Sequence, residues 1–296
     1  MSYSNDGGIN MRLKKSIILS NVLDPYTKNP KNHLETIKRI IESKRYEAIE
    51  TRLISDEETI DYLNHNKGHV SLEYYVTGDI SRANLSLSDG TSDKAIAIVK
   101  DALMIASKSN ADYLGIASGT NNQNMLKGLD IFINSLKEIF EFIKDNQLKI
   151  KLAIEPLDQY AHKKNVIGSL DFTLRMINRL EALGYDENNY IITFDTAHVA
   201  LNEDDFDESI KKLSKYIYKF HFANAILDKD DSDYGDNHMS FDRGFINESL
   251  AQHLLSIVKL NCKHDVEVAV EIREKDINHA WTLENVTYKF LECTFK

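Results

Sequence analysis

The sequence predicts a single (β/α)8 barrel, and three observations support this fold class. Short apolar runs rich in β-branched and aromatic residues alternate eight times with longer amphipathic segments. No linker divides the chain, and neither a Gly-rich dinucleotide fingerprint nor a P-loop follows an apolar run. The 296 residues, 42% of them hydrophobic, suit one large α/β domain or two smaller ones. An open doubly wound sheet is the alternative, and eight repeats favour the closed barrel.

The predicted strands are continuous apolar runs, which is the pattern of parallel strands that are buried on both faces. The sixth strand begins at Tyr190, where Ile191, Ile192, Thr193 and Phe194 follow without interruption. The other predicted strands cover residues 15–21, 46–53, 69–76, 112–117, 148–155, 218–222 and 266–272.

The segments between the strands carry apolar residues at the spacing of a helix that buries one face. Asp56 is a predicted N-cap, because its side chain can accept a backbone N–H of the first turn. Gly184 is a predicted C-cap, because glycine adopts the left-handed conformation that ends many helices. The predicted helices cover residues 30–45, 56–64, 92–110, 126–147, 169–183, 206–216, 247–260 and 278–295.

The ends of the chain and its longest loop complete the expected organisation. Residues 1–14 are predicted to form a flexible N-terminal tail, and residues 15–296 the barrel. The first ten residues are polar, contain glycine and lack the apolar core of a signal peptide. The longest irregular stretch, residues 223–245, follows the seventh predicted strand. In a barrel such a loop lies at the mouth, where loops determine specificity.

The composition limits the class of protein. A formal net charge of -10 argues against a general nucleic-acid binder, because affinity for phosphates depends on clustered Lys and Arg. The two cysteines, Cys262 and Cys293, have neither metal nor redox spacing, which predicts a reducing and hence cytoplasmic location. No apolar run is long enough to span a membrane.

Polar side chains lie at or near the ends of four neighbouring predicted strands. Glu155 ends the fifth strand and Asp195 follows the apolar run of the sixth. His221 lies in the seventh strand and Glu271 near the end of the eighth. Because the C-terminal ends of barrel strands meet at one mouth, these side chains are expected to converge. The clustered carboxylate and imidazole groups would repel and desolvate one another unless a cation neutralised them. The four residues are therefore predicted to bind a divalent metal.

The ligand types indicate which metals fit. Three carboxylates and one imidazole suit Mn²⁺, Mg²⁺ or Co²⁺ better than an ion that prefers thiolates. We predict Mn²⁺, with Mg²⁺, Co²⁺ and Zn²⁺ as alternatives. Glu50, at the end of the second predicted strand, is instead expected to be a buried hydrogen-bond anchor.

The motifs around these residues resemble those of a known family. The chain is similar to the sugar isomerases and epimerases of the xylose-isomerase-like TIM-barrel superfamily, and its motifs are closest to the ketose 3-epimerases of the tagatose and psicose type. The resemblance covers nearly the whole barrel, from about Lys15 onward. The motifs that carry it are Glu155-Pro156-Leu157-Asp158, Phe194-Asp195-Thr196-Ala197-His198, Phe220-His221 and Val270-Glu271.

The resemblance implies roles for individual residues. It implies that the four strand-end residues are the metal ligands and that His198 contacts the substrate. Asp158 stands where these epimerases usually have Asn, and Ala161 where they usually carry a Glu. His238 replaces an Arg that binds the sugar near the metal, and Arg243 lies close by. We predict substrate contacts from Asp158, His198, His238 and Arg243, and by family analogy a homo-oligomer.

The residue types predict an enzyme that moves a proton on carbon. A hydroxyketone could place two adjacent oxygens on the metal, which would stabilise the developing enediolate. Glu155 and Glu271, on opposite sides of the site, would remove and return the proton, while His198 would hold the carbonyl oxygen. The predicted function is a divalent-metal-dependent isomerase or epimerase that acts on a small sugar or sugar-like hydroxyketone.

Other functions stay open. The same enolisation would serve a lyase that acts on a sugar derivative. The superfamily also resembles abasic-site endonucleases, but those need additional His and Asp ligands for a zinc cluster and a basic DNA-binding face. A non-catalytic sugar-binding protein would have no use for clustered buried carboxylates.

The loop at residues 223–245 is strongly acidic, and this acidity bears on the substrate. Its negative charge would repel phosphate groups, although salt screens exposed charges. An unphosphorylated substrate is therefore expected. The aspartates concerned are Asp228, Asp230, Asp231, Asp233 and Asp236.

Overall fold

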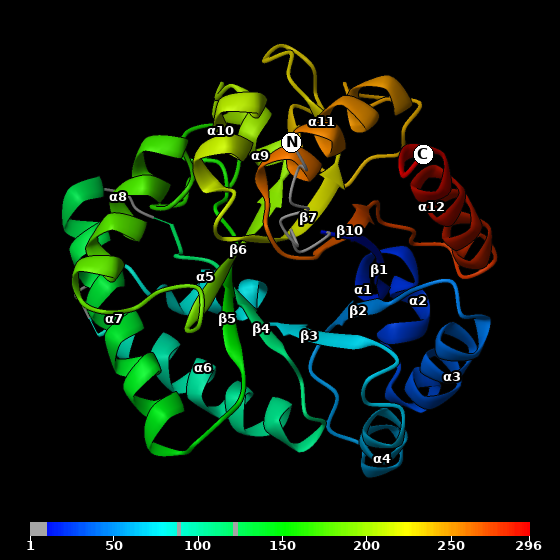
Figure 1. Ribbon diagram of the computed structural model, residues 1–296, viewed down its shortest axis with the longest axis horizontal. Coiled ribbons are helices and arrows are strands. Elements are labelled where there is room, and N and C mark those ends of the chain that lie inside the picture. The colour runs from blue at the N-terminus through cyan, green and yellow to red at the C-terminus, as the bar shows by residue number, and fades with distance from the viewer. Residues whose placement is uncertain (1–10, 88–89, 121–123) are drawn as a thin grey trace, which may run out of the picture.

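The computed structural model describes residues 11–87, 90–120 and 124–296 and shows a closed parallel barrel surrounded by helices (Figure 1). Around the barrel the strands follow the order β1-β10-β7-β6-β5-β4-β3-β2, and β1 pairs with both β2 and β10. The predicted (β/α)8 barrel is therefore confirmed. The barrel strands are β1 (Leu13–Ile18), β2 (Ala48–Thr51), β3 (Ser71–Tyr75), β4 (Tyr113–Ile116), β5 (Lys151–Ile154), β6 (Tyr190–Asp195), β7 (Ile217–Ala223) and β10 (Val266–Glu271).

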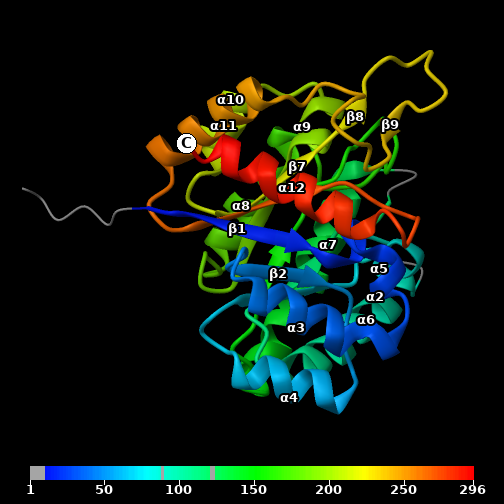
Figure 2. The same cartoon turned by 90° about the vertical axis from the view of Figure 1, so that its right-hand side faces the viewer.

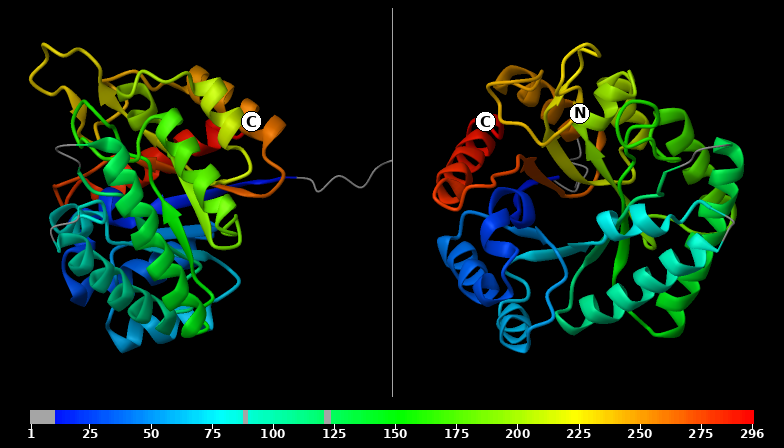
Figure 3. Two further views of the ribbon diagram at one scale, coloured as in Figure 1. Left: turned by 90° about the vertical axis from the view of Figure 1, so that its left-hand side faces the viewer. Right: turned by 180° about the vertical axis from the view of Figure 1, so that it is seen from behind.

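The predicted helices form the outer ring around the strands. Figure 3 shows the molecule from the side and from behind, where helices also cover the barrel. The Asp56 side chain accepts the N–H of Thr59 at 3.0 Å, and Gly184 has a φ of +86° after its helix, so both predicted caps are confirmed. Within the described ranges, no helix combines the length and the apolar character that crossing a membrane requires. The ring consists of α3 (His33–Ser43), α4 (Glu57–His65), α6 (Thr91–Lys108), α7 (Met125–Asp145), α8 (Leu170–Ala182), α10 (Phe206–Leu213), α11 (Glu248–Asn261) and α12 (Ala280–Thr294).

The barrel begins slightly earlier than predicted. Leu13 and Lys14 pair with Val266 and Glu267 of β10, so they belong to the sheet and not to a tail. Residues 1–10, which make up most of the predicted tail, lie outside the described residues.

Short additional elements occupy the connections that follow strands, and the sequence analysis did not predict them. The β8–β9 hairpin lies within the acidic loop at 223–245, on the side to which β1 and β2 point (Figure 2). The loop therefore lies at the mouth, as predicted. These elements are α1 (Leu19–Val22), α2 (Asp24–Thr27), the 3-10 helix η1 (Pro30–Asn32), α5 (Thr77–Ala83), α9 (Thr196–Leu201), β8 (Ala225–Ile226) and β9 (Gly235–Asp236).

The interior of the barrel contains an ionic cluster as well as apolar side chains. Lys219 of β7 is fully buried, and its Nζ lies 3.1 Å from a Glu50 oxygen, 2.8 Å from Glu73 and 2.9 Å from Glu267. Three buried carboxylates thus surround one ammonium group. Burial raises the pKa of Glu73 to about 7, against the opposing effect of the Lys219 charge. Barrel interiors are usually filled by bulky branched apolar residues, so this cluster needs an explanation.

Gly115 of β4 provides the space for the Glu73 side chain. A Cβ atom at this position would overlap Glu73 Oε1 and would lie 2.8 Å from Cβ of Tyr75. Gly115→Ala is therefore expected to lower the free energy of unfolding by about 1–3 kcal/mol, the usual effect of overfilling a packed interior. Denaturant unfolding of the variant and the wild type measures this difference. A variant as stable as the wild type would show that Glu73 can move away without cost.

Candidate metal centre

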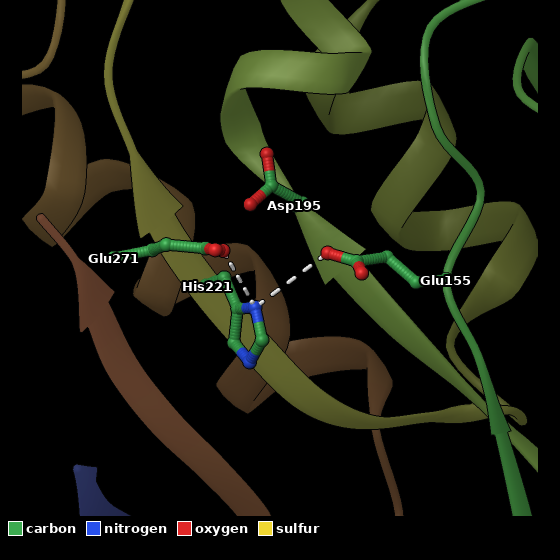
Figure 4. A group of neighbouring side chains, drawn as sticks. All are labelled: Glu155, Asp195, His221 and Glu271. Carbon is green, nitrogen blue, oxygen red and sulfur yellow. Dashed lines mark hydrogen bonds and ion pairs between the residues drawn. The ribbon is translucent and has the colours of Figure 1, made fainter. Parts of the chain in front are cut away.

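The four predicted ligands converge at the mouth of the barrel. Each offers one ligand atom, and these atoms all lie within 4.8 Å of one another. Figure 4 shows the four side chains directed toward a common point, with Glu155 and Glu271 on opposite sides of the His221 ring. The four strands that carry them, β5, β6, β7 and β10, are consecutive neighbours in the barrel.

The two carboxylate oxygens of Asp195 have different roles: one caps helix α9 and the other faces the site. Oδ1 accepts the backbone N–H groups of Ala197 at 2.8 Å and His198 at 3.1 Å, which caps α9. Oδ2 is buried and has no hydrogen-bond partner among the residues that the structure describes. Burial, together with the charges of Glu271 and Glu155, raises the pKa of Asp195 well above its ordinary value. An unsatisfied buried carboxylate oxygen is costly in a folded protein unless a cation or donor reaches it.

His221 faces the other ligands with one ring nitrogen. Its Nδ1 lies 3.2 Å from Glu271 Oε2 and 3.8 Å from Glu155 Oε1. Its Nε2 lies 2.8 Å from Glu50 Oε2, on the side of the barrel interior. Burial opposes the charged form of the ring, but the charge of Glu50 and the hydrogen bonds to Glu155 and Glu271 raise the pKa of His221 well above its ordinary value.

Glu271 is held from two sides. Asn21 Nδ2 donates a hydrogen bond to Glu271 Oε1 at 2.7 Å, and His238 Nδ1 lies 3.1 Å from the same oxygen. Burial acts against ionisation, but the charge of His238 and the hydrogen bonds from His221 and His238 keep the pKa of Glu271 well below its ordinary value. Asn21 is in turn fixed by Arg273, whose guanidinium donates to Asn21 Oδ1 at 2.9 Å.

These residues fit a divalent cation. The set consists of three carboxylates and one imidazole, and Asp195 brings to it the buried Oδ2 oxygen that has no partner among the described residues. Oxygen-rich sets with one nitrogen suit Mn²⁺, Mg²⁺ and Co²⁺, and Zn²⁺ also accepts such ligands. Bound here, a divalent charge would stabilise all three carboxylates in their ionised form.

The metal site opens into a cavity of about 130 Å³, and two of the predicted substrate residues line it. His198 accepts the backbone N–H of Asp158 at Nδ1, at 3.3 Å, so its Nε2 carries the proton. This Nε2 lies 3.8 Å from Asp236 Oδ2. The His198 ring thus presents a donor to the cavity. His238 lines the same cavity beside Glu271.

The other two predicted substrate residues lie elsewhere. The buried Asp158 carboxylate accepts the backbone N–H groups of His162 and Lys163, at 2.7 Å and 2.6 Å, so it shapes the loop after β5 instead of facing the cavity. The Arg243 side chain is 43% exposed and pairs with Asp233 at 2.5 Å and with Asp231 at 3.6 Å. Neither residue is among those that line this cavity, so their role in substrate binding stays a prediction.

The structure adds several residues to the cavity that the sequence analysis did not assign. Asn21, Tyr75, Lys163, Asp236 and Arg273 all line it. Asp236 belongs to the acidic loop that was expected to repel phosphate, but it is buried and its Oδ2 lies 3.2 Å from Lys163 Nζ. Since Lys163 and Arg273 bring positive charge to the same cavity, loop acidity alone does not exclude an anionic substrate.

One signal in the sequence could have identified Asn21. It ends the first predicted strand, just as Glu155 ends the fifth. Tyr75 ends β3 and Arg273 lies two residues after β10, so they also lie at strand ends, whereas Lys163 and Asp236 belong to the longer loops after β5 and β7.

Comparison with known proteins places this architecture among related barrels. A profile described as the xylose isomerase-like TIM barrel matches residues 54–275. The structure of L-ribulose 3-epimerase is similar with a TM-score of 0.72 and 13% sequence identity, over 96% of this chain and 94% of that one. D-psicose 3-epimerase from Clostridium cellulolyticum H10 gives a TM-score of 0.67 and 14% identity, over 95% and 98% of the two chains. The IolI protein, solved with a bound zinc atom, gives 0.70 and 16%, over 96% and 98%. No curated protein matches the chain by sequence.

Proposed function

Since the chain belongs to the xylose isomerase-like TIM-barrel family, we propose that it is a divalent-metal-dependent isomerase or epimerase of a small sugar or sugar-like hydroxyketone. The predicted family is thereby confirmed, and ketose 3-epimerases are among the structural neighbours. The single observation that carries the activity is the convergence of Glu155, Asp195, His221 and Glu271 beside a cavity lined by polar side chains. We propose Mn²⁺ as the ion because most of these ligands are carboxylates.

The arrangement supports proton transfer at a substrate carbon. When bound, a divalent ion stabilises the negative charge that develops on two adjacent substrate oxygens. Glu155 and Glu271 face each other across the His221 ring, so one can remove a proton from one face of the substrate and the other can deliver a proton to the opposite face (Figure 4). His198 presents its Nε2–H to the cavity and can hold a substrate oxygen.

The geometry of the two glutamates favours epimerisation within this proposal. Delivery of the proton to the opposite face of the same carbon inverts its configuration, and two bases on opposite sides provide this route. Delivery to the adjacent carbon would give isomerisation instead. A lyase would use the same first step on a substrate with a leaving group beside the carbon.

An endonuclease-like hydrolase is the less favoured function. Among the described residues, the group able to hold a metal comprises four ligands, whereas a zinc cluster needs more. The net charge of -10 also disfavours a phosphate backbone as ligand.

His238→Ala is expected to lower catalytic efficiency by roughly 10- to 100-fold, the effect of losing a hydrogen bond to a charged or reacting group. The reason is its position beside Glu271 Oε1 in the cavity wall. Metal content should stay at the wild-type level, because His238 is not a ligand. Arg243→Ala, in the same loop but paired with exposed aspartates, is the matched control and should keep wild-type kinetics. Equal kinetics of both variants would remove His238 from the substrate site.

Elemental analysis followed by a panel of free keto-sugars tests the proposed function. The wild type is expected to carry one divalent ion per chain and to exchange a carbon-bound hydrogen of at least one ketose with solvent deuterium. A protein without bound metal after growth with Mn²⁺, or with metal but no exchange on any ketose or keto-sugar acid, would contradict it.

A further inference from the structure

The buried carboxylate of Glu50 connects the metal centre to the ionic cluster in the barrel interior. Glu50 Oε2 faces His221 Nε2 at 2.8 Å. Glu50 Oε1 accepts a hydrogen bond from Ser16 Oγ at 2.6 Å and lies 3.1 Å from Lys219 Nζ. Glu50 is 1% exposed and Lys219 is fully buried, so water does not compete for these contacts.

The charge and chemistry of its partners fix the direction of the hydrogen bond between Glu50 and His221. The Lys219 ammonium group forms an ion pair with Oε1 of Glu50 at 3.1 Å, and its positive charge keeps the Glu50 carboxylate ionised, so both carboxylate oxygens are acceptors. Oε2 belongs to the same ionised carboxylate and is also an acceptor, so His221 must donate from Nε2. A neutral imidazole that carries its proton on Nε2 has its lone pair on Nδ1. Nδ1 is the atom that faces Glu155 and Glu271 at the metal site.

We infer that Glu50 is the positioning residue that presents His221 Nδ1 to the metal. Lys219 occupies the other Glu50 oxygen and so keeps Glu50 as the hydrogen-bond acceptor of His221 Nε2–H. This inference rests on the metal-dependent function proposed above. This role of Glu50 also explains why the barrel interior contains the ionic cluster around Lys219, directly below His221. Metal-binding histidines are commonly oriented by a carboxylate on the second nitrogen, and here that carboxylate is itself anchored by Lys219 and Ser16.

Glu50→Gln provides a test because the amide has one acceptor end and one donor end. Lys219 requires the carbonyl oxygen of Gln at the Oε1 position, which turns the NH₂ group toward His221. The ring would then have to accept at Nε2 and carry its proton on Nδ1, where the metal should bind. We expect a roughly 10- to 100-fold loss of Mn²⁺ affinity, the usual effect of losing such an orienting partner.

Glu267→Gln is the matched control. Glu267 contacts the same Lys219 Nζ at 2.9 Å and is buried, and its carboxylate is directed to the lysine and not to His221. The substitution removes the same charge from the same cluster and should leave Mn²⁺ affinity within about threefold of wild type, the spread expected of contextual effects.

Lys219→Met, alone and combined with Glu50→Gln, completes a double-mutant cycle. A general structural defect would lower Mn²⁺ affinity in both backgrounds and would not give the pattern expected here. Without Lys219 the Gln side chain can rotate, so that its carbonyl accepts from His221 Nε2 and its NH₂ donates to Ser16 Oγ. The loss caused by Glu50→Gln is therefore expected where Lys219 is present and largely absent in the Lys219→Met background. Comparison within each background cancels the direct effect of the lysine charge on the metal.

Mn²⁺ affinity of the full chain, measured by electron paramagnetic resonance, and the visible spectrum of the Co²⁺ protein are the readouts. Equal affinity of Glu50→Gln and Glu267→Gln, or an equal loss with and without Lys219, would overturn this inference alone. A wild type that binds no divalent ion would overturn the proposed function and this inference together. If proteins with Lys219→Met do not fold, the comparison of the two Gln variants, each checked by thermal unfolding, decides by itself.

Discussion

Asp195→Asn is expected to lower the affinity for the divalent ion by about a hundredfold or more and to abolish turnover, since loss of an outer partner alone can cost up to that factor. The substitution separates the two roles of Asp195. The amide oxygen can still accept the N–H groups of Ala197 and His198, so the cap of α9 is retained. The amide NH₂ then occupies the place of Oδ2 and presents a donor where a ligand is needed. Elemental analysis and metal titration of the purified variant measure the effect.

Asp204→Asn is the control for this experiment. Its carboxylate also accepts a backbone N–H, that of Leu170 at 2.8 Å, but Asp204 is not one of the metal-site residues. It should keep wild-type metal content. Metal content that is equally unaffected by Asp195→Asn would show that the ion, if bound, lies elsewhere.

Glu271→Gln is expected to reduce turnover by roughly 10²- to 10⁴-fold, the usual contribution of a general acid or base. The amide keeps one oxygen that can ligate the metal, so part of the bound ion should be retained while the base is lost. Solvent-deuterium uptake at the substrate carbon should fall in proportion to turnover. Proton and metal effects are thus distinguished by measuring exchange and metal content on the same preparation.

Glu267→Gln again serves as the control, because it makes the same change four residues earlier on the same strand, away from the cavity mouth. It should retain both exchange and turnover. Conversion of the substrate by the wild type without any solvent deuterium uptake would contradict proton transfer between the two glutamates.

The sequence predicted the barrel because its strands are continuous apolar runs and its helices have caps. It also predicted that Glu155, Asp195, His221 and Glu271 lie together, because a polar residue at the end of an apolar run is a local signal. Glu155 and Asp195 could be recognised in this way without knowing how the strands pair. The expectation that Glu50 is a buried hydrogen-bond anchor is confirmed by its contacts with Ser16, Lys219 and His221.

The residues that escaped prediction depend on registers and loop conformations. Lys219 looks like an ordinary solvent-facing lysine in a short run, although it lies two residues before His221 and therefore on the same face of β7, which the structure places inside the barrel. Asp158 and Arg243 were assigned to the substrate by their position near motifs. In the structure Asp158 accepts backbone N–H groups of its own loop, and Arg243 pairs with loop aspartates. Both outcomes reflect local folding of loops, which spacing along the chain does not reveal.

The contact between Asn21 and Glu271 has a consequence for biosynthesis. These two side chains come from opposite ends of the barrel sequence and are 250 positions apart, yet they meet across the junction of the first and last strands. A nascent chain that has not yet released its last strand can offer Glu155, Asp195 and His221 but not a fourth ligand held in place. The complete set of four side chains proposed to hold the metal, with Glu271 held by Asn21, therefore exists only after the last strand has joined the barrel.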